Sequence, residues 1–297
     1  MAADVSRLPA AKVLALTALA MLAFAGNSLL CRMALKTTAI DAGTFTTTRL
    51  LAGAIALALL VRLRGRGTGM AGEWPAAVAL FIYAAAFSYA YFSLPAGVGA
   101  LMLFGAVQVT MIGYGLWHGE RLRPVQMVGL LAACCGLVAL LVPGVQAPSW
   151  SGSMLMLAAG AAWGVYTLRG RKAASPLAVT AGNFWRAALL TLLLSAVQWR
   201  FASFDARGLA YAIASGALTS GVGYAIWYAA LPGLQAAHAA TVQLTVPVLA
   251  ALGATALLGE SLTPRLTLTS IAVLGGVALV IAGASPRPAS PAGPKLF

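Results

Sequence analysis

Acidic residues, histidine and cysteine are scarce in this sequence. Its 297 residues include six Asp and Glu, two His and three Cys. Acid–base enzymes, metal centres and disulfide frameworks all need clusters of such groups, so we expect no enzyme activity, no cofactor and no metal site. Charged residues make up 8% of the chain and apolar residues 61%. A water-soluble fold cannot bury so much apolar surface, so the composition predicts a membrane protein.

Apolar stretches of about 20 residues, the length that crosses a bilayer as a helix, recur along the chain. They lie at 12–31, 43–62, 74–93, 96–117, 124–142, 152–169, 177–199, 208–230, 235–258 and 265–283. Because many more stretches follow the first, we interpret the first as an uncleaved helix rather than a secretory signal. The prediction is an all-α integral membrane protein with ten transmembrane helices.

One short motif occurs twice. The pattern Gly-Glu-x-Leu-x-Pro occupies residues 119–124 and returns at 259–264, each time after a long apolar stretch. A repeat with an odd number of helices enters the membrane upside down in its second copy, and such inverted repeats are typical of transporters. We predict a first five-helix repeat at 1–145, a second, inverted five-helix repeat at 146–284, and a disordered cytoplasmic tail at 285–297.

Lys and Arg residues next to helix ends predict the orientation, because cytoplasmic segments carry the excess. Placing the N-terminus in the cytoplasm puts most of the 19 Lys and Arg residues on that side. The repeated loops agree, since Arg121 and Arg123 of the first copy become Ser261 and Thr263 in the second. Both termini are therefore expected in the cytoplasm. The formal charge of +13 gathers at helix ends and predicts no nucleic-acid partner.

The six acidic residues all lie in loops or near the predicted membrane interfaces. A proton-driven carrier usually keeps a carboxylate at membrane depth, so a transporter without an obligatory coupling ion fits this chain better. His238 is the one histidine inside a predicted span. Three interpretations stay open for it: a neutral imidazole that bonds neighbouring helices, a substrate contact, or a proton carrier.

Aromatic residues predict where a cavity lies. Tyr83, Phe87 and Tyr91 are four residues apart, so they share one face of the third helix. Tyr224 and Tyr228 occupy the twin positions of Phe87 and Tyr91 in the eighth helix. Two such faces on inverted helices would meet across a central pocket, although ordinary helix packing is the alternative for any single ring.

Uncharged polar side chains at membrane depth indicate the same interior. They are Asn27, Gln108, Asn183, Thr241 and Gln243. Such groups suit a polar or zwitterionic ligand. A hydrogen bond between helices, which contributes about 1 kcal/mol, explains each of them equally well.

Two arginines, Arg49 and Arg186, are twins as well. Both lie near the beginning of a predicted helix. We interpret them as anchors whose long side chains reach back to water, and binding of a substrate carboxylate is the alternative.

Three prolines mark candidate hinges or gates. Pro95 and Pro232 lie in very short, charge-free connections, where Pro near Gly permits a tight reversal of the chain. Pro247 lies inside the ninth helix and should kink it, because it lacks a backbone N–H. Val107 stands at the equivalent place in the first repeat, so we do not expect the two halves to bend alike.

Several segments together carry a family resemblance. They are Leu-Leu-Gly-Glu-Ser-Leu-Thr-Pro at 257–264, the pair Gly275 and Gly276, and Trp-Gly-Val-Tyr-Thr at 163–167 ahead of Arg171 and Lys172. With them, residues 12–283 resemble the drug/metabolite transporter superfamily and, more narrowly, its ten-helix EamA-type exporters. Aromatic amino-acid exporters of the YddG type are the nearest match.

The resemblance implies a bacterial inner-membrane exporter that moves amino acids, aromatic ones included, and related small metabolites by alternating access. It also implies a substrate cavity lined by helices one, three, four, six, eight and nine. The candidate substrate-binding residues on these helices are Asn27, Tyr83, Phe87, Tyr91, Gln108, Trp163, Tyr224, Tyr228, His238, Thr241 and Gln243.

We therefore expect a facilitative exporter that is monomeric in the lipid bilayer. Two alternatives stay open. One is a proton-coupled drug/metabolite antiporter that uses His238, and the other is a channel-like membrane protein.

Overall fold

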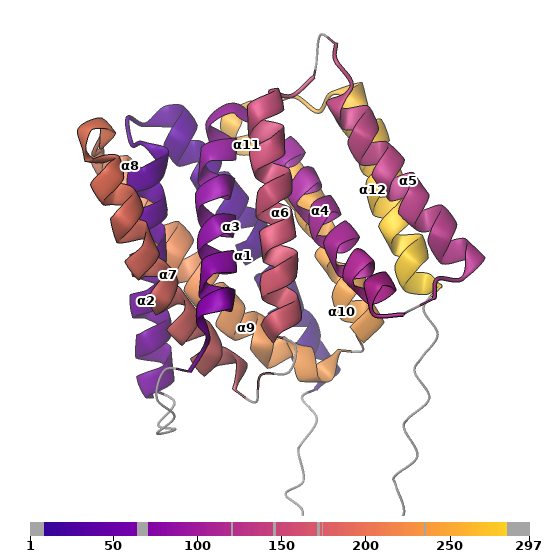
Figure 1. Cartoon of the computed structure of the whole chain (residues 1–297), viewed down its shortest axis with the longest axis horizontal. Helices are drawn as coiled ribbons and strands as arrows, with labels where there is room; N and C mark the ends of the chain where they lie inside the picture. The colour runs from indigo at the N-terminus through magenta and orange to yellow at the C-terminus, as the bar shows by residue number, and fades with distance from the viewer. Residues whose placement is uncertain are drawn as a thin grey trace, which may run out of the picture.

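The computed structural model describes residues 9–63, 71–119, 121–144, 147–170, 173, 175–234 and 236–283. All regular elements within these residues are helices (Figure 1), which confirms the all-α prediction. The first half contains α1 (Ala10–Thr37), α2 (Ala42–Leu63), α3 (Trp74–Ser93), α4 (Ala96–Trp117) and α5 (Pro124–Leu141). The second half contains α6 (Trp150–Gly170), α7 (Pro176–Val197), η1 (Trp199–Phe201), α8 (Ala206–Ala214), the π-helix η2 (Ser215–Val222), α9 (Gly223–Ala230), η3 (Leu231–Gly233), α10 (Ala236–Gln243), α11 (Thr245–Leu258) and α12 (Pro264–Ala282).

In the described part of the chain, nine helical segments are long and apolar enough to cross a membrane. α6 falls outside this group although it has 21 residues. It packs against α3 and α4, and small residues such as Gly160 and Gly164, which touch α4 there, lower its mean hydropathy. With α6 counted as well, the segments match the spans expected from the sequence.

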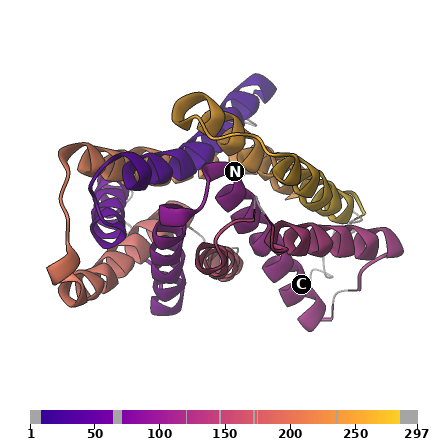
Figure 2. The same cartoon turned by 90° about the horizontal axis from the view of Figure 1, so that it is seen from above.

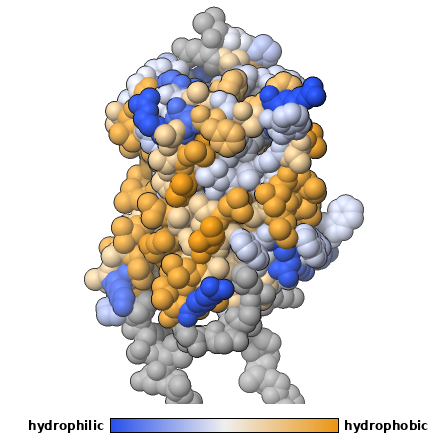
Figure 3. Space-filling view, turned by 90° about the vertical axis from the view of Figure 1, so that its left-hand side faces the viewer, coloured by the Kyte–Doolittle hydropathy of each residue, from blue (hydrophilic) through white to orange (hydrophobic). Residues whose placement is uncertain are grey.

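The outer surface of the bundle is apolar around its middle and polar towards both ends (Figure 3). Leu59, Leu193 and Leu268 expose 55%, 66% and 68% of their surface. In water such exposure would be unfavourable, whereas hydrocarbon chains satisfy it and the helices already satisfy their own backbone groups. The surface confirms the prediction of an integral membrane protein.

The connections divide between two ends of the bundle (Figure 1). α1 begins and α12 ends at the same end, which we call the terminal end. The connection that contains Arg121 lies there too, whereas the connection that contains Ser261 lies at the opposite, far end. Opposite ends for these two copies of one loop are compatible with an inverted repeat.

Packing between helices follows the same pattern. α2 packs against α7, α4 against α11, and α5 against α12. α3 packs on α6 much as α1 packs on η2 and α9. The first three contacts join helices at equivalent places in the two halves. The last two contacts are counterparts of each other, and a pseudo-two-fold axis would require this pattern.

The predicted ninth helix is broken. Leu244 separates α10 from α11, and its N–H donates to the carbonyl of Thr241, only three residues earlier, at 3.0 Å. Pro247 lies three residues after the break and has no N–H for a fourth-residue bond, so the predicted kink is confirmed. α4 continues without interruption through Val107. Pro95 precedes α4 and Pro232 lies in η3, and hinge roles for these prolines stay predictions.

Glycines allow α5 and α12 to touch at one end of the elongated outline (Figure 2). A Cβ atom added to Gly276 would lie 2.4 Å from the carbonyl oxygen of Gly129, and one added to Gly129 would lie 2.5 Å from that of Gly276. Small residues at such crossings let helix backbones approach in lipid, where no hydrophobic effect drives helices together.

We expect Gly276→Ala to lower the free energy of unfolding by about 1–3 kcal/mol, because the added methyl group overpacks this crossing. Gly275→Ala is the matched control, since a Cβ there meets no atom within 4 Å. Thermal unfolding of both variants in detergent makes the comparison. Equal unfolding temperatures would show that the two helices do not pack this closely.

Candidate functional site

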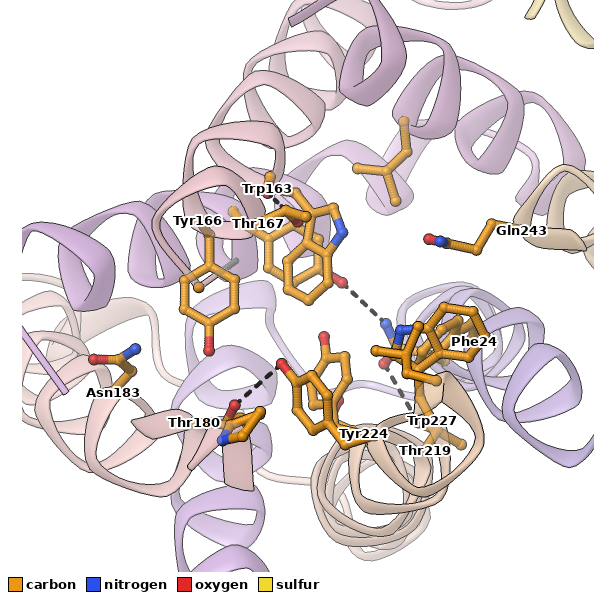
Figure 4. Close-up of a pocket in the computed structure, with 18 of the residues that line it drawn as sticks. Phe24, Trp163, Tyr166, Thr167, Thr180, Asn183, Thr219, Tyr224, Trp227 and Gln243 are labelled. Atoms are coloured by element: carbon orange, nitrogen blue, oxygen red, sulfur yellow. Dashed lines mark hydrogen bonds between the residues drawn. The ribbon is translucent and has the colours of Figure 1, made fainter. Parts of the chain in front are cut away.

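A cavity of about 450 Å³ lies between the two halves of the chain. Its lining residues come from α1, α3, α4, α6, α7, η2, α9, η3 and α10. Helices α3, α4 and α6 form one side, and η2 and α9 form the side opposite (Figure 4). Within the described residues, no group of three or more His, Cys, Asp or Glu side chains could hold a metal ion.

Aromatic rings form much of the wall, with Trp163 at their centre (Figure 4). The centroid of its ring lies 4.7 Å from that of Tyr83 and 5.2 Å from that of Tyr166. Tyr224 stacks on it with centroids 5.4 Å apart and planes inclined by 19°. Phe24 extends this wall by contacting Tyr224 at 5.7 Å. Stacked and tilted rings at these distances attract one another and leave flat apolar faces for a ligand.

Neutral hydrogen-bonding groups occupy the remaining wall. Ser215 Oγ donates to Asn27 Oδ1 at 2.7 Å, and Asn27 Nδ2 donates to the Tyr83 hydroxyl at 3.3 Å. Thr180 Oγ1 donates to the Tyr228 hydroxyl at 3.3 Å. These bonds hold the polar atoms in place, and apolar rings combined with a few fixed polar groups are typical of small-molecule sites.

The two ends of the cavity differ. At the terminal end the lining continues through Gly170, Ala173 and Leu231, beside the ends of α6 and α9. At the far end, Glu260 Oε1 accepts a hydrogen bond from Arg32 Nε at 2.8 Å, and Oε2 accepts one from the Ala96 N–H at 2.7 Å.

Arg32 completes this closure, because its Nη1 donates to the Tyr91 carbonyl at 2.9 Å. The side chains of Arg32 and Glu260 are only 12% and 10% exposed. One ion pair thus joins α1, the α3–α4 turn and the α11–α12 turn. Glu260 can reach the turn because Gly259, at φ +64, ends α11 in the left-handed conformation that glycine adopts without strain.

Most of the predicted contact residues line the cavity: Asn27, Tyr83, Phe87, Trp163, Tyr224, Tyr228 and Gln243. The others do not. Tyr91 is wholly buried and donates to the Ala96 carbonyl at 3.3 Å. His238 and Thr241 are exposed on α10, and Gln108 is partly buried on α4. A role for these four residues in transport stays a prediction.

The structure adds lining residues that the sequence analysis did not place there. Thr180 is one of them and lies three residues before Asn183, which was predicted at the interior, on α7, a helix that was not expected at the cavity. Their spacing puts two polar groups on one helix face, which was a usable signal. Phe24, Tyr166 and Trp227 also line the cavity, but no pattern separates them from ordinary membrane aromatics.

The interpretation of Arg49 as an anchor that reaches water is wrong. Its side chain is 1% exposed, because α3 and η2 both pack against α2. Its twin Arg186 is partly exposed and donates to the carbonyls of Ala71 and Gly182 at 3.1 and 3.0 Å. Anchoring near the terminal end therefore describes Arg186 alone.

Comparison with solved structures supports the fold. A crystal structure of 20% sequence identity superposes with a TM-score of 0.64 and covers 93% of this chain and 98% of the other. At that identity the likeness concerns the fold alone.

Comparison with protein sequences identifies relatives. An uncharacterized protein of Pseudomonas aeruginosa is 58% identical over 260 residues, which cover 87% of this chain and 90% of that protein. The threonine/homoserine exporter RhtA of Escherichia coli is 36% identical over 152 residues, 48% of this chain and 50% of RhtA. A probable amino-acid metabolite efflux pump of Salmonella typhimurium is 30% identical over 187 residues, 58% of this chain and 62% of the pump.

The model of the EamA-like transporter family matches residues 150–282. This region comprises α6 to α12, which carry Trp163, Tyr224 and the Glu260 closure. The chain belongs to the EamA-like transporter family of the drug/metabolite transporter superfamily.

Proposed function

We propose that this protein exports amino acids, aromatic ones included, and related small metabolites by alternating access, without an obligatory coupling ion. The observation that carries the proposal is the cavity itself. Its wall combines stacked rings around Trp163 with neutral polar groups such as Asn27 and Thr180. Aromatic faces suit a flat apolar side chain, and the polar groups suit the charged ends of a zwitterion.

The names of the relatives support the substrate class. RhtA is a threonine/homoserine exporter and the Salmonella relative is a probable amino-acid metabolite efflux pump. Aromatic substrates are our addition to this class, and this part of the proposal is based on the aromatic cluster of Tyr83, Trp163 and Tyr224.

The unequal ends of the cavity support alternating access. Its lining reaches the terminal end, while the Arg32–Glu260 pair closes the far end. With both termini in the cytoplasm of a bacterial inner membrane, this arrangement is the inward-facing state of a monomer built from two inverted repeats. Export then requires opening at Glu260 and closing near Leu231.

Facilitative transport is supported by where the acids lie. None of the described acidic residues lines the cavity. His238, on which a proton-coupled mechanism would depend, is exposed on α10 and is not among the lining residues.

Counterflow in liposomes tests the function. Vesicles loaded with unlabelled phenylalanine should transiently accumulate labelled phenylalanine or threonine from outside, with no pH or sodium gradient. A carrier saturates and exchanges its substrate, whereas a channel gives no overshoot. Absence of counterflow for every amino acid would overturn the proposal, and counterflow that appears only with an imposed proton gradient would overturn its facilitative part.

We expect Trp163→Ala to raise the half-saturation concentration for phenylalanine about tenfold or more, because truncating a central aromatic contact costs about 2 kcal/mol. Trp185→Ala is the matched control, since Trp185 is 44% exposed and does not line the cavity. The half-saturation concentrations of the two variants are measured by transport kinetics in the same vesicles. If the two variants behave alike, the aromatic wall does not bind the substrate.

Glu260→Gln should favour opening at the far end. It removes the negative charge that pairs with Arg32, and hydrogen bonds to charged groups contribute about 1.5–3 kcal/mol, so the open population should rise about tenfold or more. The reporter is Ser28→Cys in a chain whose three natural cysteines are replaced by Ala. An impermeant maleimide added at the far side should label this cavity residue faster.

Glu73→Gln is the control for this experiment. Glu73 pairs with Arg169 at 3.0 Å, but the two side chains are 50% and 44% exposed, and such surface pairs contribute little. The Glu73→Gln variant of the reporter chain should be labelled as fast as the reporter chain that keeps both glutamates. If Glu260→Gln gives the same rate, the ion pair does not close the far end.

A further inference from the structure

Arg49 is a buried cation whose hydrogen bonds are incomplete. Its Nη2 donates to the Tyr83 hydroxyl at 3.0 Å. Its Nε and Nη1 are buried and have no partner. The guanidinium carbon lies 4.8 Å from the ring centroid of Phe87 and 5.3 Å from that of Tyr83, and both rings line the cavity. Ring contacts of this kind attract a cation but leave its N–H groups unsatisfied.

The described acidic residues do not neutralise this charge. Glu260 pairs with Arg32, and Glu73 pairs with Arg169. Asp205 accepts the Gly208 N–H at the beginning of α8.

Asp41 is engaged as well, at the beginning of α2. It accepts the N–H groups of Ser203 and Thr44 at 2.8 and 2.9 Å. Partial burial acts to raise the pKa of Asp41, but these hydrogen bonds outweigh it and hold the pKa below its usual value. Arg49 is thus a charge at membrane depth for which the described residues provide no anion, an expensive arrangement that usually marks function.

Backbone packing places Arg49 beside the polar wall of the cavity. A Cβ atom on Gly216 would lie 2.0 Å from the Arg49 carbonyl oxygen, so only glycine lets η2 approach α2 this closely. The preceding residue, Ser215, donates to Asn27 Oδ1. The same contact between α2 and η2 therefore brings Arg49, Ser215 and Asn27 together around Tyr83.

Tyr83 connects this group to the cavity. Its hydroxyl oxygen accepts two hydrogen bonds, one from Arg49 Nη2 and one from Asn27 Nδ2. Both lone pairs of the oxygen are then occupied, so the O–H hydrogen is free to donate elsewhere. A hydroxyl that accepts from a guanidinium is polarised and becomes a stronger donor to an anion.

We propose that Arg49, together with Tyr83 and Asn27, binds the carboxylate of the transported molecule. The Tyr83 O–H donates to the carboxylate, Asn27 adds its amide, and Arg49 supplies the compensating charge directly behind them. The side chain of the substrate then lies against Trp163 and Tyr224. This assignment rests on the proposed function, because it names the part of the same cavity that selects a free carboxylate.

Binding measured by intrinsic fluorescence of the purified full-length protein in detergent tests the assignment with three probes. Phenylalanine carries a carboxylate and an amine, 3-phenylpropionate only the carboxylate, and phenylalaninamide only the amine. We expect the two carboxylates to bind about tenfold or more tightly than the amide. Arg49→Met should abolish this preference, and Arg49→Lys should retain part of it.

Two further variants make the experiment decisive. Tyr83→Phe keeps the ring but removes the hydroxyl, so it should also weaken the preference for carboxylates even if Arg49→Met folds poorly. Arg186→Met is the matched control, because it changes the twin arginine outside the cavity, and it should leave the preference intact.

The outcomes separate this inference from the proposed function. If 3-phenylpropionate binds through Arg49 while no amino acid is bound or transported, the exporter proposal is wrong and the carboxylate site stands. If the amide binds as tightly as phenylalanine, or if the folded Arg49→Met and Tyr83→Phe variants keep the preference, the carboxylate site is wrong.

Discussion

Lipid offers no water and no counterions, so a charge at membrane depth is tolerated only where the protein or a ligand compensates it. This constraint explains the layout of the chain. Most of its cations and acids lie at or near the ends of helices, and the ion pair of Arg32 and Glu260 lies at the far end, where α11 stops. The polar wall of the cavity is made of neutral groups such as Asn27 and Thr180. Arg49 is buried and has no anionic partner among the described residues, which is why the proposed carboxylate site is built around it.

Residues at equivalent positions of the two predicted repeats have different surroundings. Arg186 reaches backbone carbonyls near the terminal end, whereas Arg49 is buried behind Tyr83. The difference follows from what covers each helix. α3 and η2 both pack on α2, and Gly216 permits the closest contact at Arg49 itself. In the proposed site, an arginine that cannot reach water is available to a ligand instead of serving as an anchor.

Membrane class, helix limits and the break near Pro247 were predictable from the sequence, because each depends on a local property: apolar length, backbone satisfaction or a missing N–H. The rotation of each helix about its own axis was not predictable from the sequence. Lipid and the protein interior are both apolar, so a membrane helix shows little of the polar and apolar division that reveals the inner face of a soluble helix. The place of α7 at the cavity and the burial of Arg49 depend on that rotation. Tyr83 was found because the spacing of its neighbouring aromatic residues marks one face, and Trp163 was found through the family resemblance.

The irregular backbone lies on one side of the cavity. α3, α4 and α6 are continuous helices, whereas the opposite side contains the π-helix η2 and the break between α10 and α11. Regular helices resist bending, while π segments and missing hydrogen bonds are common where function requires local change. Closing the cavity near Leu231 and opening it at Glu260 should therefore deform the second half more than the first. The two sides of the cavity would then move unequally around a common substrate, with α3, α4 and α6 fixed and η2 and α10 yielding.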